Sequence, residues 1–269
     1  MLLAIDIGNT HTVIGLYESS DSDLLITTWR IKTTKSAAVD DIRSKILPLF
    51  SVSGVDTIEV TEAILASVVP ALTTAWTEAM ESIWGIQPII CTAKVAEEAG
   101  LFSTDYPNPQ EIGADRVADA VAVRARYGAP AVVADFGTAT NFEVIDRSGA
   151  FVGGVIAPGL RTGADALFVH ATKLAATELT APDRAIGRNT EEAIQSGLIF
   201  GEAYRADALI TQMLTELGEE TRRAGGDCAV VATGGFAELV SRYSSVISDI
   251  DPNLTLEGLR LIAHRIKGN

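Results

Sequence analysis

The chain has 269 residues, of which 47% are hydrophobic and 21% are charged, a composition typical of a globular protein with one or two domains. Its net charge of −14 disfavours surfaces that bind nucleic acid or anionic lipid, because such surfaces are positively charged. We see neither an apolar run long enough to span a membrane nor the features of a signal peptide. The two cysteines, Cys91 and Cys228, lack the spacing of metal ligands and favour a reducing compartment. We therefore expect a cytoplasmic protein without nucleic-acid or membrane partners.

The first half of the chain alternates between strand-like and helical patterns. Short apolar runs stopped by turn residues predict strands, and apolar residues at helical spacing predict helices. The expected strands are 2–6, 12–17, 24–31, 63–69 and 87–91, and the expected helices are 39–50, 71–84 and 115–127. Residues 101–111 contain Pro107 and Pro109 and are expected to form a loop.

The second half begins again with three strands, which indicates a duplicated architecture. The expected strands are 131–135, 141–146, 150–156 and 228–232, and the expected helices are 190–223 and 256–267. Alternating strands and helices predict an α/β fold, and the restart predicts two similar domains that face one another. We place the domains at residues 1–115 and 116–269.

The first strand ends in an acid that is followed by a glycine and polar residues. The acid is Asp6, and Gly8, Asn9, Thr10 and Thr12 follow it. Ligands bind such sheets at the carboxyl ends of the strands, where Gly8 would permit close approach of the backbone. An acid beside neutral donors suits a polyphosphate bound to Mg²⁺, with the acid toward the metal and the donors toward phosphate oxygens.

The second half repeats this motif after its own first strand. Asp135, Gly137 and Thr138 lie 129 positions after their counterparts in the first half. One copy alone would more often be an ordinary turn, whereas two copies in register favour a site for phosphoryl transfer. The further turn Gly234-Gly235 could support a flat group such as adenine, although in isolation a close-packed turn explains it better.

Six motifs in one order resemble those of type III pantothenate kinases, in the superfamily of acetate and sugar kinases, heat-shock chaperones and actin. The likeness spans nearly the whole chain. The first motif alone marks only the superfamily, whereas the third and fourth together are specific to this type. The motifs are Asp6-x-Gly8-Asn9-Thr10, Ser67-Val68-Val69-Pro70, Gly113-Ala114-Asp115-Arg116, Asp135-Phe136-Gly137-Thr138-Ala139-Thr140, Gly187-x-Asn189-Thr190 and Thr233-Gly234-Gly235.

The resemblance implies a fold, an activity and a set of cofactors. The fold would be two similar ribonuclease-H-like domains, duplicated as in actin, with the active-site cleft between them, in a homodimer. The activity would be transfer of the ATP γ-phosphoryl group to the 4′-hydroxyl of pantothenate, the first step of coenzyme A biosynthesis. Mg²⁺ and a monovalent cation, K⁺ or NH₄⁺, would be required.

The resemblance also implies roles for individual residues. Asp115 would be the general base, and Asp135 would hold the monovalent cation. The residues expected to contact ATP are Asp6, Ile7, Gly8, Asn9, Thr10, His11, Thr12, Val13 and Thr138. The residues expected to contact pantothenate are Tyr106, Gly113, Ala114, Asp115, Arg116 and, from the partner subunit, Thr190.

The residue chemistry agrees with these roles and leaves alternatives open. Asp115 at a helix start is stabilised as an anion and could accept a hydroxyl proton, and Arg116 could hold the pantothenate carboxylate. Asp115 could instead be a helix cap beside a surface arginine. The chain departs from the usual family pattern at Asn141, Glu143 and Glu202.

Two other functions compete with the kinase. One is a non-catalytic regulatory protein of the same fold that binds a nucleotide, and the other is a kinase or phosphatase with a different acceptor. The presence of Asp6, Asp115, Arg116 and Asp135 favours an enzyme. Release of ADP with and without pantothenate would discriminate between these functions.

Overall fold

The computed structural model describes residues 1–171 and 174–268. The chain forms two compact units, one of Met1–Ala122 together with the residues from Leu254 onward, and one of Val123–Asn253. This division differs from the expected boundary between residues 115 and 116. The C-terminal helix α8 (Leu254–Lys267) packs into the first unit, where Gly258 lies so close to the Ala118 carbonyl that a Cβ atom would be 1.9 Å from its oxygen.

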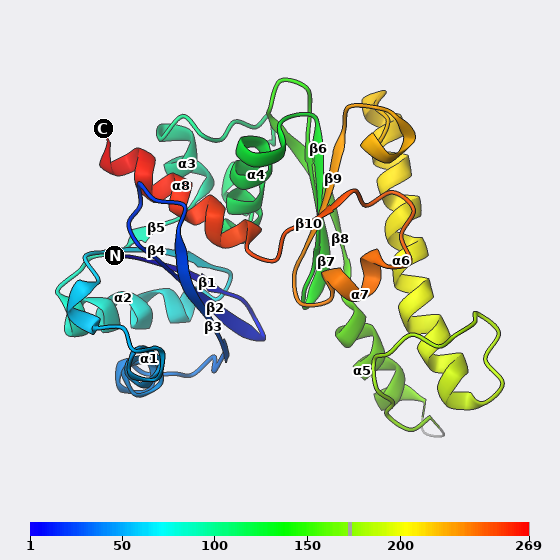
Figure 1. The fold of residues 1–269 in the computed structure, drawn as a ribbon, viewed down its shortest axis with the longest axis horizontal. Helices are drawn as coiled ribbons and strands as arrows, with labels where there is room; N and C mark the ends of the chain where they lie inside the picture. The colour runs from blue at the N-terminus through cyan, green and yellow to red at the C-terminus, as the bar shows by residue number, and fades with distance from the viewer. Residues whose placement is uncertain (172–173, 269) are drawn as a thin grey trace. The chain divides into compact units, whose positions relative to one another are not determined.

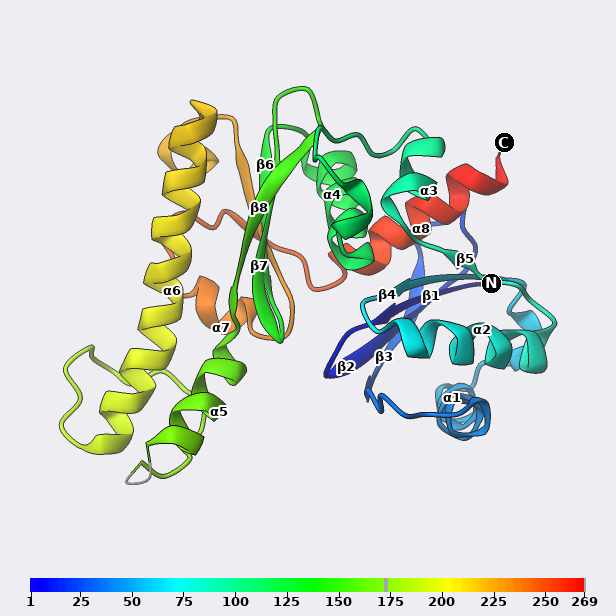
Figure 2. The same cartoon turned by 180° about the vertical axis from the view of Figure 1, so that it is seen from behind.

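The first unit is built on a five-stranded sheet with the order β3-β2-β1-β4-β5. Helices α1 and α2 lie on one side of this sheet, and α3 and α8 lie on the other (Figures 1 and 2). Apolar side chains of α1 and α2 form a buried core with one face of β1 and β2, which fixes the sheet between its helices. The elements are β1 (Leu2–Ile7), β2 (His11–Tyr17), β3 (Leu25–Lys32), α1 (Val39–Ser53), β4 (Glu62–Ser67), α2 (Pro70–Trp84), β5 (Ile89–Ile90), α3 (Ala93–Glu98) and α4 (Ala114–Tyr127), which continues into the second unit.

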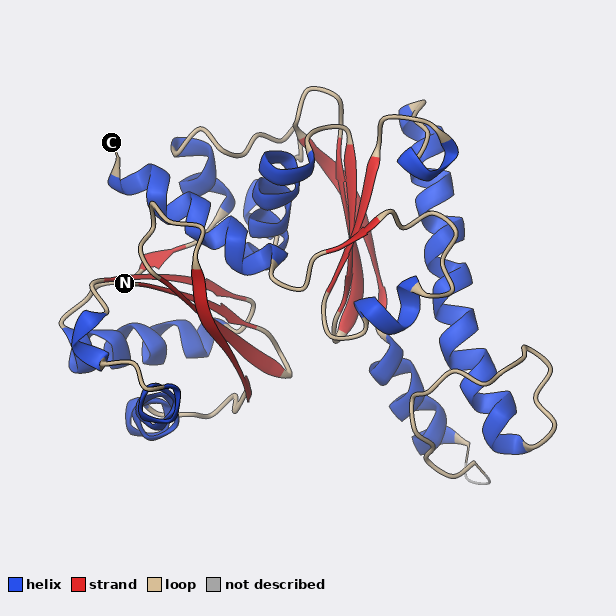
Figure 3. Cartoon of the chain, in the orientation of Figure 1, coloured by secondary structure: helices blue, strands red, loops and turns tan. Residues whose placement is uncertain are grey.

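The second unit has a five-stranded sheet with the order β8-β7-β6-β9-β10, the same topology as the first. Figure 3 shows the strands of both sheets in red and the helices in blue. Helices α6 and α7 pack against one face of this sheet through a core that includes Phe142, Ala203 and Ala237. The elements are β6 (Ala131–Phe136), β7 (Ala139–Ile145), β8 (Phe151–Pro158), α5 (Leu160–His170), α6 (Thr190–Leu217), β9 (Ala229–Thr233), α7 (Ala237–Ser241) and β10 (Asp249–Ile250).

The two sheets match closely enough to define equivalent residues. Both second strands carry an irregularity at the same place, between Leu16 and Tyr17 in β2 and between Val144 and Ile145 in β7. The first hairpin pairs Asp6 with Val13 and the second pairs Asp135 with Asn141, so the second turn is one residue shorter. Equivalent residues of β1 and β6, before the turn, are therefore 129 positions apart. Equivalent residues of β2 and β7, after the turn, are 128 positions apart.

The helix expected at 190–223 is shorter than the sequence suggested. Helix α6 ends at Leu217, because Gly218 adopts a left-handed conformation with φ of 69° and its N–H bonds to the carbonyls of Leu214 and Thr215. The expected loop at 101–111 contains a short 3₁₀ helix, Pro109–Glu111. The strand expected at 150–156 spans Phe151–Pro158 instead.

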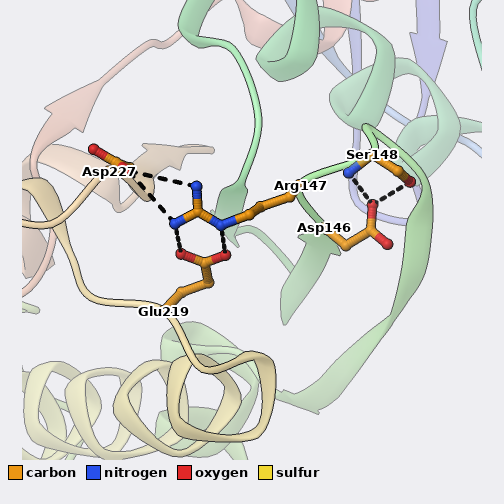
Figure 4. Close-up of polar contacts among 5 residues, drawn as sticks. All are labelled: Asp146, Arg147, Ser148, Glu219 and Asp227. Atoms are coloured by element: carbon orange, nitrogen blue, oxygen red, sulfur yellow. Dashed lines mark hydrogen bonds and ion pairs between the residues drawn. The ribbon is translucent and has the colours of Figure 1, made fainter.

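A polar cluster closes the turn between β7 and β8, at the end of the sheet opposite Asp135. The Arg147 guanidinium lies between Glu219 and Asp227, with its Nη2 2.6 Å from Glu219 Oε2 and 3.4 Å from Asp227 Oδ2 (Figure 4). Beside it, the Ser148 hydroxyl donates to Asp146 and lowers the pKa of that carboxyl. Ala131, at the start of β6, pairs with Ile145 at this end of the sheet, so the cluster lies at the opposite end from Asp135.

Breaking the ion pair between Arg260 and Glu257 of α8 on one side should destabilise the first unit, because an unpaired carboxylate is left behind. Arg260 is 7% exposed, donates two hydrogen bonds to Glu257, and reaches the Ser20 carbonyl at 2.8 Å. Arg260→Met would leave the Glu257 carboxylate without this partner, so we expect a loss of about 3 kcal/mol in the free energy of unfolding, measured with urea. The double variant Arg260→Met with Glu257→Gln should recover part of that loss, and a single variant as stable as the parent would contradict the expectation.

Candidate active site

The first turn lies at the carboxyl end of β1. Asp6 pairs with Val13 on one side and with Ala66 of β4 on the other, which puts it near the end of the sheet. The Gly8 N–H donates to the His11 carbonyl at 3.1 Å, and a Cβ atom on Gly8 would be 2.9 Å from that oxygen. The turn therefore needs a residue without a side chain at this position.

The residues of the first turn that are expected to contact ATP differ in burial, and Asp6, Gly8 and Val13 are partly exposed. Asn9, Thr10 and His11 are exposed, as phosphate contacts require. Ile7 and Thr12 are buried, and the Thr12 hydroxyl lies 3.0 Å from the hydroxyl of Thr33. Thr12 and Ile7 would therefore support the turn or contribute main-chain groups, with their side chains directed away from solvent.

The expected base, Asp115, lies in the first turn of helix α4. The Arg116 N–H donates to Asp115 Oδ1 at 2.9 Å. A Cβ atom on Gly113 would lie 2.5 Å from the same oxygen, so the glycine gives the carboxylate its space. Burial raises the pKa of Asp115, and this effect is opposed by the hydrogen bond from the Arg116 N–H and by the charge of its guanidinium. A carboxylate with a raised pKa is suited to accept a proton.

Cys91 lies against the start of α4, beside the main chain that precedes Asp115. Its thiol donates to the Ala114 carbonyl at 3.6 Å, directly before Asp115. Burial, followed by the negative charges of Asp115 and Asp6, raises the pKa of Cys91 to about 12. Cys91 is buried, and no local sequence pattern could show that its thiol lies against the start of α4.

Tyr106 lies in the loop before α4. Its N–H donates to the Thr104 hydroxyl at 3.0 Å, and the residue is 37% exposed. The exposure leaves part of the aromatic side chain accessible to a ligand.

In the second unit, Asp135 lies near the end of β6, paired with Asn141 and with Thr233 of β9. Gly234 has a φ of +89°, and a Cβ atom there would be 2.2 Å from Asp135 Oδ1. Only glycine meets both conditions. The Gly234 turn therefore makes room for the Asp135 carboxylate, which supports the close-packed explanation of this motif.

The Thr138 turn is held by its main chain. The Thr138 carbonyl accepts hydrogen bonds from the Gly159 N–H at 3.2 Å and from the Thr162 hydroxyl at 2.6 Å. A Cβ atom on Gly159 would be 2.5 Å from the carbonyl oxygens of Gly137 and Thr138. The start of α5 thus packs directly on this turn.

Glu202 of α6 lies behind the same turn. It is 6% exposed, and its carboxylate accepts a hydrogen bond from the Thr140 hydroxyl at 2.6 Å. Arg205 donates to the other carboxylate oxygen at 2.5 Å and to the Pro158 carbonyl at 2.8 Å. The departure from the family pattern at residue 202 is therefore a buried, paired carboxylate that links α6 to β7 and β8.

Thr190 is exposed at the start of α6. The helix is capped by Asn189, whose side chain accepts a hydrogen bond from the Glu192 N–H at 2.9 Å. Because Asn189 supplies the cap, the Thr190 hydroxyl is not required for it. Glu192 also accepts a hydrogen bond from the Arg188 N–H, which fixes the loop before the helix.

The described residues form no cluster of metal ligands and no helix that could span a membrane. Within the described ranges, 1–171 and 174–268, no three His, Cys, Asp or Glu side chains group as metal ligands. In the same part of the chain, every helix is too short or too polar to cross a membrane.

Comparison with solved structures supports the actin-like fold. An activator of 2-hydroxyisocaproyl-CoA dehydratase from Clostridium difficile aligns over 99% of this chain and 96% of its own, with a TM-score of 0.57 and 11% identity. An ROK hexokinase from Thermus thermophilus aligns over 100% of this chain and 99% of its own, with a TM-score of 0.50 and 12% identity. At these identities the likeness concerns the fold alone.

Comparison of sequences identifies the family. The family described as type III pantothenate kinase matches residues 2–212. A type III pantothenate kinase from Desulfosudis oleivorans is 41% identical over 265 residues, which cover 97% of this chain and 98% of the relative. Another from Moorella thermoacetica is 40% identical over 98% of this chain and 99% of the relative. With these matches over nearly its full length, the chain belongs to the type III pantothenate kinase family.

Proposed function

We propose that Asp115 is the general base of this ATP-dependent pantothenate kinase, an enzyme family that phosphorylates pantothenate in coenzyme A biosynthesis. The observation that carries the proposal is the placement of its carboxylate over Gly113 at the start of α4, with a pKa raised by burial. Attack by the 4′-hydroxyl on the γ-phosphorus requires removal of its proton, and the Asp115 carboxylate would accept it. The family match does not favour the regulatory alternative.

The first turn is proposed to bind the phosphates of ATP. Its exposed residues Asn9, Thr10 and His11 offer N–H groups and polar side chains, and Gly8 keeps the turn compact. Thr138 in the second turn would contribute a further phosphate contact. Asp6 would face Mg²⁺ or its bound waters, because hard divalent cations prefer oxygen ligands. Bound Mg²⁺ would neutralise charge on the transferring phosphoryl group.

Pantothenate is proposed to contact the segment from Gly113 to Arg116. The Arg116 guanidinium would bind its carboxylate by charge-assisted hydrogen bonds. Tyr106, which is partly exposed, and Thr190 from a partner subunit would complete the substrate contacts. A shared site of this kind would make dimerisation necessary for activity.

A homodimer is supported by apolar side chains exposed on the second unit. Val152 and Ile156 lie on β8, the edge strand of its sheet, and Val169 and Tyr204 lie on α5 and α6. Contiguous exposed apolar surface marks protein interfaces, so these side chains are the candidates for the contact between the subunits of the proposed homodimer. The two reduced, buried cysteines agree with a cytoplasmic location, which we also propose.

The acceptor is tested by direct product analysis. The purified protein with MgATP and K⁺ should convert pantothenate to 4′-phosphopantothenate, identified by mass spectrometry, with ADP formed in equal amount. ADP release that is unaffected by pantothenate, in a folded dimer with both cations present, would point to another acceptor. An absence of both product and ADP release would favour the regulatory alternative.

A further inference from the structure

Thr33 lies directly after β3 and contacts the first turn at three points. Its N–H donates to the Thr10 carbonyl at 2.9 Å, and its hydroxyl donates to the Gly8 carbonyl at 2.8 Å. The same hydroxyl lies 3.0 Å from that of Thr12. Thr33 is 9% exposed, so these bonds are shielded from water.

The pattern assigns a direction to each bond. A hydroxyl group has one proton, and that of Thr33 is given to the Gly8 carbonyl. The Thr12 hydroxyl must therefore donate to Thr33, which forms a chain from Thr12 through Thr33 to Gly8. This chain accounts for the burial of Thr12 within an otherwise exposed turn.

These bonds also determine which way the N–H groups of the turn point. In a planar trans peptide the C=O and the following N–H point in opposite directions. Among residues 1–171 and 174–268, a cis peptide bond occurs only at Ala129-Pro130, outside this turn. With the Gly8 and Thr10 carbonyls held toward Thr33, the N–H groups of Asn9 and His11 are directed away from it.

The second unit holds its turn at the equivalent place by different means. Gly159 follows β8 as Thr33 follows β3, and its N–H donates to the Thr138 carbonyl at 3.2 Å. Gly159 has no hydroxyl group, and the Thr162 hydroxyl and the Glu202 carboxylate supply the remaining bonds. Each turn is thus anchored to the residue after its third strand, which indicates that the shape of the turn matters in both units.

We propose that Thr33 is a positioning residue for ATP, which orients the N–H groups of Asn9 and His11 toward the phosphates. This inference rests on the proposed binding of ATP phosphates by the first turn. Thr33 itself is buried behind the turn and acts through Gly8, Thr10 and Thr12. It follows that loss of its hydroxyl should weaken nucleotide binding more than it changes the chemical step.

The test compares Thr33→Val with Thr33→Ser and with a control on β3, Thr28→Val, where the side chain is exposed. Valine keeps the shape of threonine but leaves the Gly8 carbonyl and Thr12 hydroxyl without their partner. We expect the Kd for MgATP, measured by calorimetry, to rise about tenfold in Thr33→Val. The serine variant and the control should stay within about twofold of the parent, as should kcat and the KM for pantothenate in Thr33→Val.

Gly8→Ala separates failure of this inference from failure of the proposed ATP site. If Gly8→Ala weakens MgATP binding and Thr33→Val does not, the turn binds phosphate but Thr33 does not position it. If neither variant changes the Kd, the first turn is not the phosphate site, and both proposals fall. If Thr33→Val lowers the melting temperature, kcat and both substrate affinities together, and serine does not rescue them, Thr33 has a general structural role instead.

Discussion

Asp115→Asn is expected to lower kcat by roughly 10²–10⁴-fold and to leave the Kd for MgATP nearly unchanged. Asparagine keeps the size of the side chain and an oxygen that can accept the hydrogen bond from the Arg116 N–H. It cannot accept the proton of the attacking hydroxyl. The variant therefore removes the proposed base while preserving the local packing over Gly113.

The pH dependence gives an independent measurement. Burial raises the pKa of Asp115 above the ordinary aspartate value of 3.8. The base is active when deprotonated, so kcat/KM should fall as the pH is lowered through this raised pKa, at a higher pH than for an exposed aspartate. The free energy of unfolding changes in the opposite direction. It falls as the pH rises through the raised pKa, because burial disfavours the ionised form of Asp115 in the folded state. Asp115→Asn should therefore be at least as stable as the parent at neutral pH, with the difference shrinking as the pH falls.

Asp165→Asn provides the matched control for the base. This substitution makes the same chemical change at an exposed position of α5 in the second unit. Its kcat should remain that of the parent. If Asp115→Asn keeps kcat within about threefold of the parent, the proton is accepted elsewhere and Asp115 is not the base.

The core strands and the duplication were predictable because their signals are local. The apolar runs before Asp6 and Asp135 are bounded by turn residues, and the structure confirms strands at Leu2–Ile7 and Ala131–Phe136. The repeated order of strands likewise predicted two similar units, and the two sheets have the same topology. Helix α6 was predicted to extend to residue 223, because the residues after Gly218 are also compatible with a helix. The glycine ends the helix at Leu217.

Other features depend on contacts that a linear pattern does not contain. A fixed repeat of 129 residues aligns Thr12 with Asn141, whereas the shorter second turn makes Thr140 its equivalent. The support given by Thr33 and Glu202 to the two turns is also invisible in the sequence. Each reaches its turn from another element, so only the folded arrangement identifies the contact.

The candidate base, Asp115, combines a feature that the sequence predicts with features that depend on tertiary contacts. The motif around Asp115 predicted a helix start with an acid, and α4 begins at Ala114. The motif could not show that the carboxylate occupies the space above Gly113 or that the Cys91 thiol donates to the Ala114 carbonyl beside it. Burial raises the pKa of Asp115, so its chemical character follows from tertiary packing.

Activity is expected to depend on a monovalent cation held by Asp135. The absence of a side chain at Gly234 leaves room for the Asp135 carboxylate beside the main chain of Phe136. K⁺ accepts carboxylate and carbonyl oxygens in place of its hydration shell. A cation there would offset the charge of Asp135 and favour binding of anionic substrates. Rates at constant ionic strength should therefore be low in Na⁺ and rise about tenfold in K⁺ or NH₄⁺.

Asp135→Asn should flatten this response, because the variant loses the charged ligand while keeping the size of the side chain. Asp6→Asn is the matched control, since Asp6 has the equivalent position at the end of β1. The Asp6→Asn variant should bind MgATP more weakly and yet retain the stimulation by K⁺. A titration of KCl against NaCl measures this stimulation for each variant. Equal rates of the parent protein in Na⁺ and K⁺ would refute the cation site. A normal K⁺ response in Asp135→Asn would assign the cation to another residue, because the carboxylate is the charged group that the proposal places against it.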